Sequence, residues 1–187
     1  MTDELARQDR TRGLAFFSKS QLLTNGDVAR AMKRMAHEIV ERNHGATDVV
    51  LVGLERGGVA IAKHIGQMLT EIGSPPAAVC TLDVTAFRDD LEQQVGEAST
   101  SPEVAINERV VIVVDDVLFT GRTVRAALVA LSHWGRPASV QLAVLVDRGH
   151  RELPIRPDFV GKNVPTSRAE SIKATLEGVW LGVKEAQ

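Results

Sequence analysis

The chain has 187 residues, of which 44% are hydrophobic, and a net charge of −2, so it suits one globular domain with no overall electrostatic attraction to nucleic acid. Its single cysteine, Cys80, excludes an internal disulfide and fits a reducing compartment. No apolar run reaches membrane-spanning length and the N-terminus lacks the apolar segment of a signal peptide, so we expect a cytoplasmic protein with no membrane partner.

The first part of the chain predicts an arm, a helix and a strand. Residues 1–20 are polar and are expected to form a flexible N-terminal arm, which leaves residues 21–187 as a single domain. A turn and cap signal at residues 24–27 precedes an apolar stripe that predicts a helix over about 28–42. Residues 48–53 predict a strand that runs into a glycine-rich turn, Gly53 to Gly58, and a second helix.

A further strand is expected over residues 78–84, after which the apolar pattern fails from residue 87 to about 107. This segment is polar and contains glycine and proline. A loop this long in a compact domain is uncommon, and it is usually functional or disordered.

The next segment carries the most informative motif of the chain. Five apolar residues, 110–114, predict a short buried strand that stops at Asp115 and Asp116. A Thr-Gly-Arg-Thr turn, residues 120–123, then opens a helix, and ligands of open α/β sheets bind where strands end in this way. The free N–H groups of a helix start, close backbone approach at Gly121 and two hydroxyls favour a phosphate.

The two adjacent carboxylates suit sugar hydroxyls or a divalent cation held through water, because they would repel a phosphate. A ribose that carries a 5′-phosphate satisfies both halves of the motif. The alternative is a plain strand–turn–helix, in which Asp115 and Asp116 are turn and cap residues.

The remainder of the chain completes an alternating pattern. Residues 140–146 predict a buried strand that runs into a charged loop, 147–154, and residues 172–181 suggest a terminal hairpin. Strands that alternate with helices favour an α/β fold with a doubly wound, mostly parallel sheet and helices on both faces.

The motif resembles the phosphoribosyl-pyrophosphate (PRPP) binding motif of type I phosphoribosyltransferases. The resemblance implies that fold, with a small hood and a flexible loop, and Mg²⁺ as the cofactor bound with PRPP, although no direct protein ligand of the metal is assigned. The ribose and 5′-phosphate contacts would fall on Asp115, Asp116, Val117, Leu118, Phe119, Thr120, Gly121, Arg122 and Thr123.

Two further segments gain a role beside this motif. The turn formed by Gly53, Glu55, Arg56 and Gly57 would hold the pyrophosphate through backbone N–H groups and a charge-assisted donor; the alternative is a tight connection with a solvated arginine. The 87–107 segment, with Arg88 and Asp89, would be a lid that excludes water from an oxocarbenium-like sugar; the alternative is a disordered surface loop.

Residues 83–90, 135–137, 141–156 and 161–167 together resemble the family of bifunctional pyrimidine operon attenuation regulators and uracil phosphoribosyltransferases. The resemblance covers about residues 27–176 and implies that uracil lies beside a loop of Asp158, Phe159, Val160 and Gly161. Enzymes that act on 6-oxopurines place an aspartate at the position of Phe119, whose ring cannot accept a hydrogen bond from a purine.

The chain departs from the family at two of these positions. The family usually has a tyrosine where this chain has Phe119, so the hydroxyl is lost and the ring is kept. Many relatives also place the arginine of the pyrophosphate turn one position later than Arg56.

Positive charge is concentrated in two segments. Residues 28–42 and 147–173 each carry a net charge of +2, so the rest of the chain carries −6. On charge alone, the first helix could simply have a solvated face with i, i+4 ion pairs. The resemblance instead implies an RNA surface, although Lys33 replaces a usual threonine; its residues would be Arg34, His37, Arg42, His150 and Lys162.

Three hypotheses remain open from the sequence. The protein is a uracil phosphoribosyltransferase that also binds pyrimidine-operon leader RNA in response to UMP or UTP, a salvage enzyme without RNA binding, or a non-catalytic nucleotide sensor. The complete ribose-phosphate motif argues against the third. The resemblance also implies a homodimer or a higher homo-oligomer.

Overall fold

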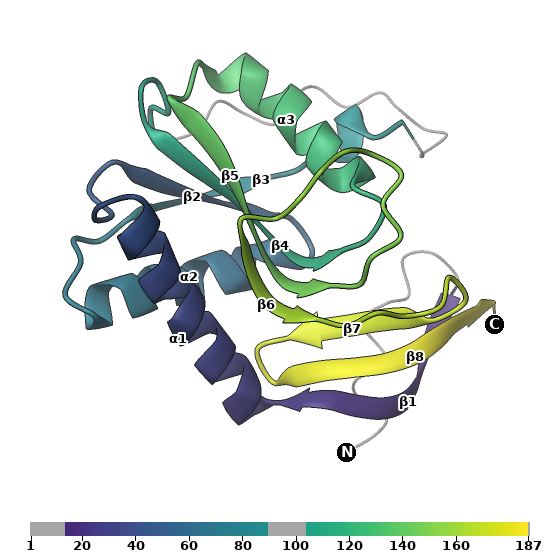
Figure 1. The fold of residues 1–187 in the computed structure, drawn as a ribbon. Coiled ribbons are helices and arrows are strands. Elements are labelled where there is room, and N and C mark those ends of the chain that lie inside the picture. Colours follow the sequence, from purple (N-terminus) through teal and green to yellow (C-terminus); the bar gives the residue numbers. More distant parts are fainter. Residues whose placement is uncertain (1–13, 90–103, 187) are drawn as a thin grey trace.

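The computed structural model describes residues 14–89 and 104–186. Its centre is a five-stranded sheet in which every neighbouring pair is parallel, as predicted (Figure 1). In spatial order, the strands are β3 (Ala78–Leu82), β2 (Val49–Leu54), β4 (Val110–Leu118), β5 (Ser139–Asp147) and β6 (Phe159–Asn163).

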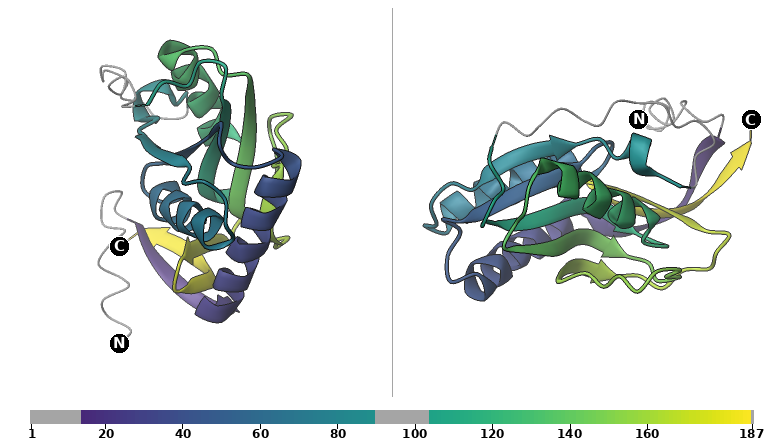
Figure 2. Two further views of the ribbon diagram at one scale, coloured as in Figure 1. Left: turned by 90° about the vertical axis from the view of Figure 1, so that its left-hand side faces the viewer. Right: turned by 90° about the horizontal axis from the view of Figure 1, so that it is seen from above.

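Helices cover both faces of this sheet, so its central strands are apolar on both sides. On one face, α1 (Asn25–Arg42) and α2 (Gly58–Glu71) pack on side chains such as Leu51 and Leu145. On the other face, α3 (Arg122–Trp134) packs on the alternate residues, such as Val113 and Val144 (Figure 2). The period-2 alternation of a strand therefore divides the core into two apolar clusters.

The strand order reverses direction between β2 and β4, which makes this part of the sheet edge a topological switch point. From β2 the chain passes to β3 on one side, and it then returns to β4 on the other side of β2. Ligands of open α/β sheets bind at such a switch point, outside the carboxyl ends of the strands. The predicted pyrophosphate turn follows β2, and the predicted ribose-phosphate motif spans the end of β4 and the start of α3.

A second, antiparallel sheet lies at one end of the parallel sheet (Figures 1 and 2). Its strands are β1 (Leu14–Thr24), β8 (Gly178–Ala186) and β7 (Ser171–Thr175), in that order. The terminal hairpin predicted from residues 172–181 is confirmed, because β7 and β8 pair through a turn at Leu176 and Glu177.

The arm predicted for residues 1–20 is wrong over residues 14–20. These residues belong to β1, which pairs with β8 from Leu14 opposite Ala186 to Thr24 opposite Gly178. The backbone hydrogen bonds of β1 are made with a strand at the other end of the sequence, so the local sequence pattern does not predict them. Residues 1–13 lie outside the described residues, as do residues 90–103 of the predicted lid.

Two element boundaries also differ from prediction. The first helix begins at Asn25 because Thr24 caps it, with Asp27 completing a capping box. β4 continues to Leu118, so the two acidic residues lie within the last part of the strand and not after it. Within the described residues, none of the helices is long and apolar enough to cross a membrane.

Candidate active site

The two carboxylates of the central motif lie at the carboxyl edge of β4. Asp115 is buried, with 7% of its surface exposed, and its carboxylate accepts the N–H of Asp116 at 3.0 Å. The Asp116 carboxylate accepts the N–H of Val117 at 2.7 Å. Burial, together with the neighbouring charge of Asp116, raises the pKa of Asp115 well above its usual value, and burial also raises the pKa of Asp116. The pair therefore favours a ligand that donates hydrogen bonds or brings positive charge.

The turn after these carboxylates presents donors at the start of α3. Gly121 immediately precedes the helix with φ of 95°, a left-handed conformation that suits glycine. Its neighbour Thr120 accepts the N–H of Arg122 at 3.4 Å, which helps to fix the turn. The turn borders a cavity of about 300 Å³ whose lining residues are Arg88, Asp115, Val117, Leu118, Phe119, Thr120, Gly121, Arg122, Thr123, Val124 and Glu152.

The predicted pyrophosphate turn packs directly against these carboxylates. A Cβ atom added to Gly57 would lie 2.3 Å from Cγ of Asp116, and one added to Gly58 would lie 1.9 Å from the Val114 carbonyl oxygen. Only glycine permits such approaches. Between the glycines of this turn, Arg56 adopts a positive φ of 76°, which is uncommon for a residue with a side chain. The structure thus joins two turns that are about 60 residues apart in sequence.

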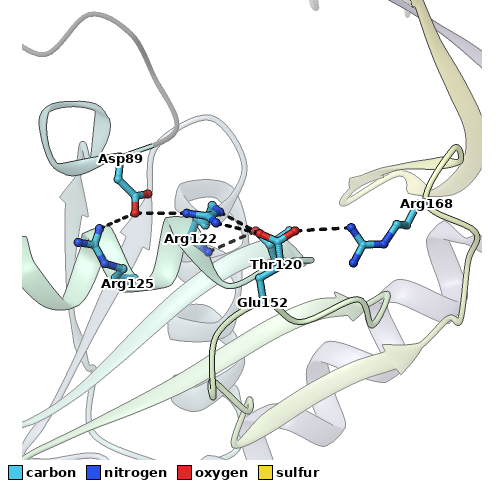
Figure 3. A network of polar contacts seen from close by, with 6 residues as sticks. All are labelled: Asp89, Thr120, Arg122, Arg125, Glu152 and Arg168. Carbon is cyan, nitrogen blue, oxygen red and sulfur yellow. Dashed lines mark hydrogen bonds and ion pairs between the residues drawn. The ribbon is translucent and has the colours of Figure 1, made fainter.

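The described part of the predicted lid also reaches this place. Arg88 lines the cavity, and its charge acts on Asp115. Asp89 forms ion pairs with Arg122 at 3.3 Å and with Arg125 at 3.2 Å (Figure 3). Both residues therefore lie beside the ribose-phosphate motif.

Two residues near the site were missed by sequence reasoning. Glu152 lines the cavity, but an acid gives no signal for a phosphate site. Lys184 of β8 lies close enough to lower the pKa of Asp116, although burial raises it overall. The pairing of β8 with β1 that brings Lys184 to this place depends on contacts between the two ends of the chain.

Phe119 is enclosed by charged and polar groups. The Arg148 guanidinium lies 4.1 Å from the centre of its ring, and the His150 ring meets it edge-on at 5.8 Å. Arg148 is itself buried and donates to the carbonyls of Ser167 and Glu170 at 2.9 and 2.6 Å. Burial lowers the pKa of Arg148. Phe119 thus connects the phosphate turn to the segment that leads into β7.

The predicted uracil loop is engaged on the side of α1. Asp158 accepts the N–H of Leu142 at 2.8 Å and pairs with Arg42 at 2.8 Å. Phe159 is buried in the cluster under α1 and α2, and the carbonyls of Val160 and Gly161 accept hydrogen bonds from Arg34. None of the four lines the 300 Å³ cavity in the described part of the chain.

The predicted RNA residues fall into two groups. Arg34 and Lys162 line a second cavity of about 320 Å³ between α1 and β6. His37 is exposed one turn along α1 from Arg34, and Arg42 lies at the end of the helix. His150 lies apart from them, beside Phe119 and the carbonyl of Thr166.

The fold and the site together define a class of protein. The family model of the phosphoribosyl transferase domain matches residues 18–174. A solved structure of a hypoxanthine phosphoribosyltransferase from Staphylococcus aureus has the same fold, with a TM-score of 0.69, 18% identity, and 90% of this chain and 93% of that chain covered.

Curated relatives are much more similar in sequence. A Bifunctional protein PyrR from Roseiflexus sp. is 54% identical, with 88% of this chain and 92% of the relative covered. The protein of the same name from Herpetosiphon aurantiacus is 52% identical, with 85% and 90% covered. The chain belongs to the phosphoribosyl transferase domain family and, within it, to the family of bifunctional PyrR proteins.

Proposed function

We propose that this protein transfers the phosphoribosyl group of PRPP to uracil, which yields UMP and pyrophosphate, and that it also binds pyrimidine-operon leader RNA as a transcription attenuation regulator. The observation that carries the enzymatic part is the contact of Gly57 with Asp116. This contact supports the proposal because it joins the turn after β2, the proposed pyrophosphate site, to the end of β4, the proposed ribose-phosphate site, at the switch point between these strands.

The geometry suggests how the residues divide the work. The Thr120–Thr123 turn and the start of α3 would bind the 5′-phosphate, and Asp115 and Asp116 would accept the ribose hydroxyls. The glycine-rich turn with Arg56 would bind the pyrophosphate. The bond from C1 of the ribose to the pyrophosphate oxygen breaks, uracil N1 forms a bond to the same carbon, and the N1 proton is released. Arg88 would contribute positive charge at the departing group.

Phosphoribosyltransferases generally use Mg²⁺ with PRPP, and the donor set here fits that ion. Mg²⁺ keeps much of its water and is bound through one or two carboxylates together with substrate phosphates. Asp115 and Asp116 would hold it through water, and their raised pKa values indicate that a nearby cation would favour their ionised forms. When bound, the cation would neutralise charge on the pyrophosphate. In the described part of the chain, no group of three or more potential metal-binding side chains occurs.

Phe119 supports a pyrimidine over a purine. Its ring borders the cavity at the place where purine enzymes carry an aspartate, and a phenyl ring accepts no hydrogen bond from purine N7. Uracil itself is proposed from the family to which the chain belongs. The proposed uracil contacts remain the backbone groups of residues 158–161. The carbonyls of Val160 and Gly161 would have to exchange their hydrogen bonds from Arg34 for hydrogen bonds from uracil.

The first test is a transfer assay with uracil, hypoxanthine and guanine, each with PRPP and with or without Mg²⁺. We expect UMP to form from uracil in a Mg²⁺-dependent manner, with no purine product. Faster turnover with either purine would contradict the proposal.

The regulatory part is supported by the basic residues around α1 and β6 and by the relatives that are named bifunctional. A salvage enzyme without RNA binding is the alternative, because Arg34 and Arg42 already pair with Glu38 and Asp158. We further propose that the protein forms a homodimer or a higher homo-oligomer, which sedimentation would test.

A further inference from the structure

The proposed phosphate cavity contains an unexpected carboxylate. Glu152, in the loop after β5, lines the cavity beside Thr120 and Gly121. An uncompensated carboxylate at this place would repel a phosphate. The binding of PRPP alone therefore does not explain why Glu152 lies at this place.

The carboxylate is held by basic side chains, and its backbone is joined to the phosphate turn. The Glu152 N–H donates to the Thr120 carbonyl at 3.0 Å. Its Oε2 atom accepts from Nε of Arg122 at 3.0 Å and forms an ion pair with Nη2 of the same side chain at 3.0 Å. Its other oxygen, Oε1, faces Arg168 at 3.6 Å. Glu152 thus contacts both ends of the Thr120–Arg122 segment (Figure 3).

Arg122 is fixed from a second side. The Asp89 carboxylate lies 3.3 Å from Nη1 of Arg122 and also pairs with Arg125, one turn along α3. The hydrogen bond that Arg122 donates to Glu152 raises the pKa of Arg122 most, and the charge of Asp89 raises it further. The guanidinium is therefore held between two carboxylates, while the backbone N–H of Arg122 donates to the Thr120 hydroxyl at 3.4 Å.

We propose that Glu152 is a positioning residue for the 5′-phosphate: by binding the Arg122 side chain it holds the Thr120–Thr123 turn in its phosphate-binding form. This proposal rests on the proposed function of the turn. Arg122 neutralises the carboxylate, so its charge does not oppose the ligand. Glu152 touches neither the sugar carbon nor the base in this role, and it acts through Arg122.

A simple surface ion pair offers a competing account. Exposed ion pairs commonly contribute about 0–1 kcal/mol to stability and nothing specific to binding. The chain contains a matched example in Glu38, which pairs with Arg34 on α1 and has 38% of its side chain exposed, against 34% for Glu152. Glu38→Gln is therefore the control for Glu152→Gln and Glu152→Ala.

Two readouts test the proposal. In the uracil assay, we expect Glu152→Ala to raise the KM for PRPP about tenfold with little change in kcat, because a charge-assisted contact is lost. Glu152→Gln keeps an acceptor for Arg122 and should recover most of the loss, and Glu38→Gln should match the wild type. By amide hydrogen exchange without ligand, the peptide around residues 118–125 should exchange faster in Glu152→Ala than in the other proteins.

The outcomes separate the two proposals. If the wild type lacks uracil transfer, the proposed function fails, and the exchange comparison still decides the role of Glu152. If Glu152→Ala matches Glu38→Gln in the exchange of residues 118–125, Glu152 does not position the turn. An unchanged KM for PRPP in an active Glu152→Ala enzyme overturns the proposal equally.

Discussion

Two acidic residues of the site lie where ionisation of their carboxyl groups is unfavourable. Asp115 is buried and its neighbour Asp116 is partly buried, and burial raises the pKa of both. Such an arrangement costs stability unless something compensates it. Residues in unfavourable environments of this kind gather at functional sites, which is why the pair is better explained by binding than by a turn or a cap.

Replacement of Asp116 by asparagine separates these explanations. The variant loses a charge-assisted acceptor for the ribose hydroxyls, which corresponds to about 1.5–3 kcal/mol, or about 10- to 150-fold in kcat/KM for PRPP. Its melting temperature should not fall, because an amide avoids the cost of a second buried charge. Steady-state kinetics and a melting curve on one preparation provide the measurement, and unchanged kinetics would leave Asp116 a structural residue.

At the scale of elements, the sequence predicted what local chemistry determines. The buried strand before Asp115, the turn at Gly121 and the helix after it follow from residue types within one short stretch. The contact of Gly57 with Asp116 was not predictable, because it depends on which strands are neighbours. The pairing of β1 with β8 escaped prediction for the same reason, as did the position of Lys184 beside Asp116.

Gly57→Ala tests the contact between the two turns. Gly57 has φ of −141°, outside the left-handed region that favours glycine, but the new Cβ would lie 2.3–2.6 Å from the Asp116 carboxylate. We expect PRPP use to fall at least about tenfold with a smaller effect on folding, because the carboxylate must move from its place. Kinetics with PRPP and a melting curve decide this.

Two other glycines provide the comparison. Gly58→Ala should mainly lower the melting temperature, because its Cβ would meet the Val114 carbonyl oxygen at 1.9 Å. Gly66→Ala in α2 meets only side-chain atoms, at 3.3 Å and beyond, and should keep both properties. If all three variants bind PRPP like the wild type, the proposed proximity of the turns to the ligand is wrong.

The helix that carries the proposed RNA residues depends on its cap. Hydrogen bonds from Thr24, first from its side chain and then from its backbone, lower the pKa of Asp27. Thr24→Ala should lower the melting temperature by about 2–4 °C at neutral pH through loss of the N-cap. A carboxyl group whose pKa is lowered by folding stabilises the folded state at pH values above its usual pKa. This stabilisation is lost as the pH falls through the pKa of the folded state. The difference between variant and wild type should therefore shrink below about pH 4; a constant difference would exclude the Asp27 contribution.

At the scale of the whole molecule, the proposed phosphate site and the proposed RNA residues of α1 and β6 lie on different parts of the fold. The phosphate cavity lies at the carboxyl end of β4, whereas Arg34 and Lys162 line a cavity between α1 and the edge strand β6. Arg34 reaches the carbonyls of Val160 and Gly161, two of the proposed uracil contacts. A nucleotide that uses those carbonyls would therefore affect a proposed RNA residue directly.

This arrangement predicts that UMP and RNA bind cooperatively. If UMP strengthens RNA binding, RNA must strengthen UMP binding by the same factor. Titration of a pyrimidine-operon leader RNA, with and without UMP, measures one side of this coupling, and titration of UMP with and without RNA measures the other.

Binding of RNA should weaken steeply as salt rises, because each phosphate contact releases counterions. The double variant Arg34→Ala, Lys162→Ala should bind more weakly and with a smaller salt slope, whereas Lys63→Ala on α2 should match the wild type. Equal and weak binding by all three proteins would leave a uracil phosphoribosyltransferase without a regulatory role.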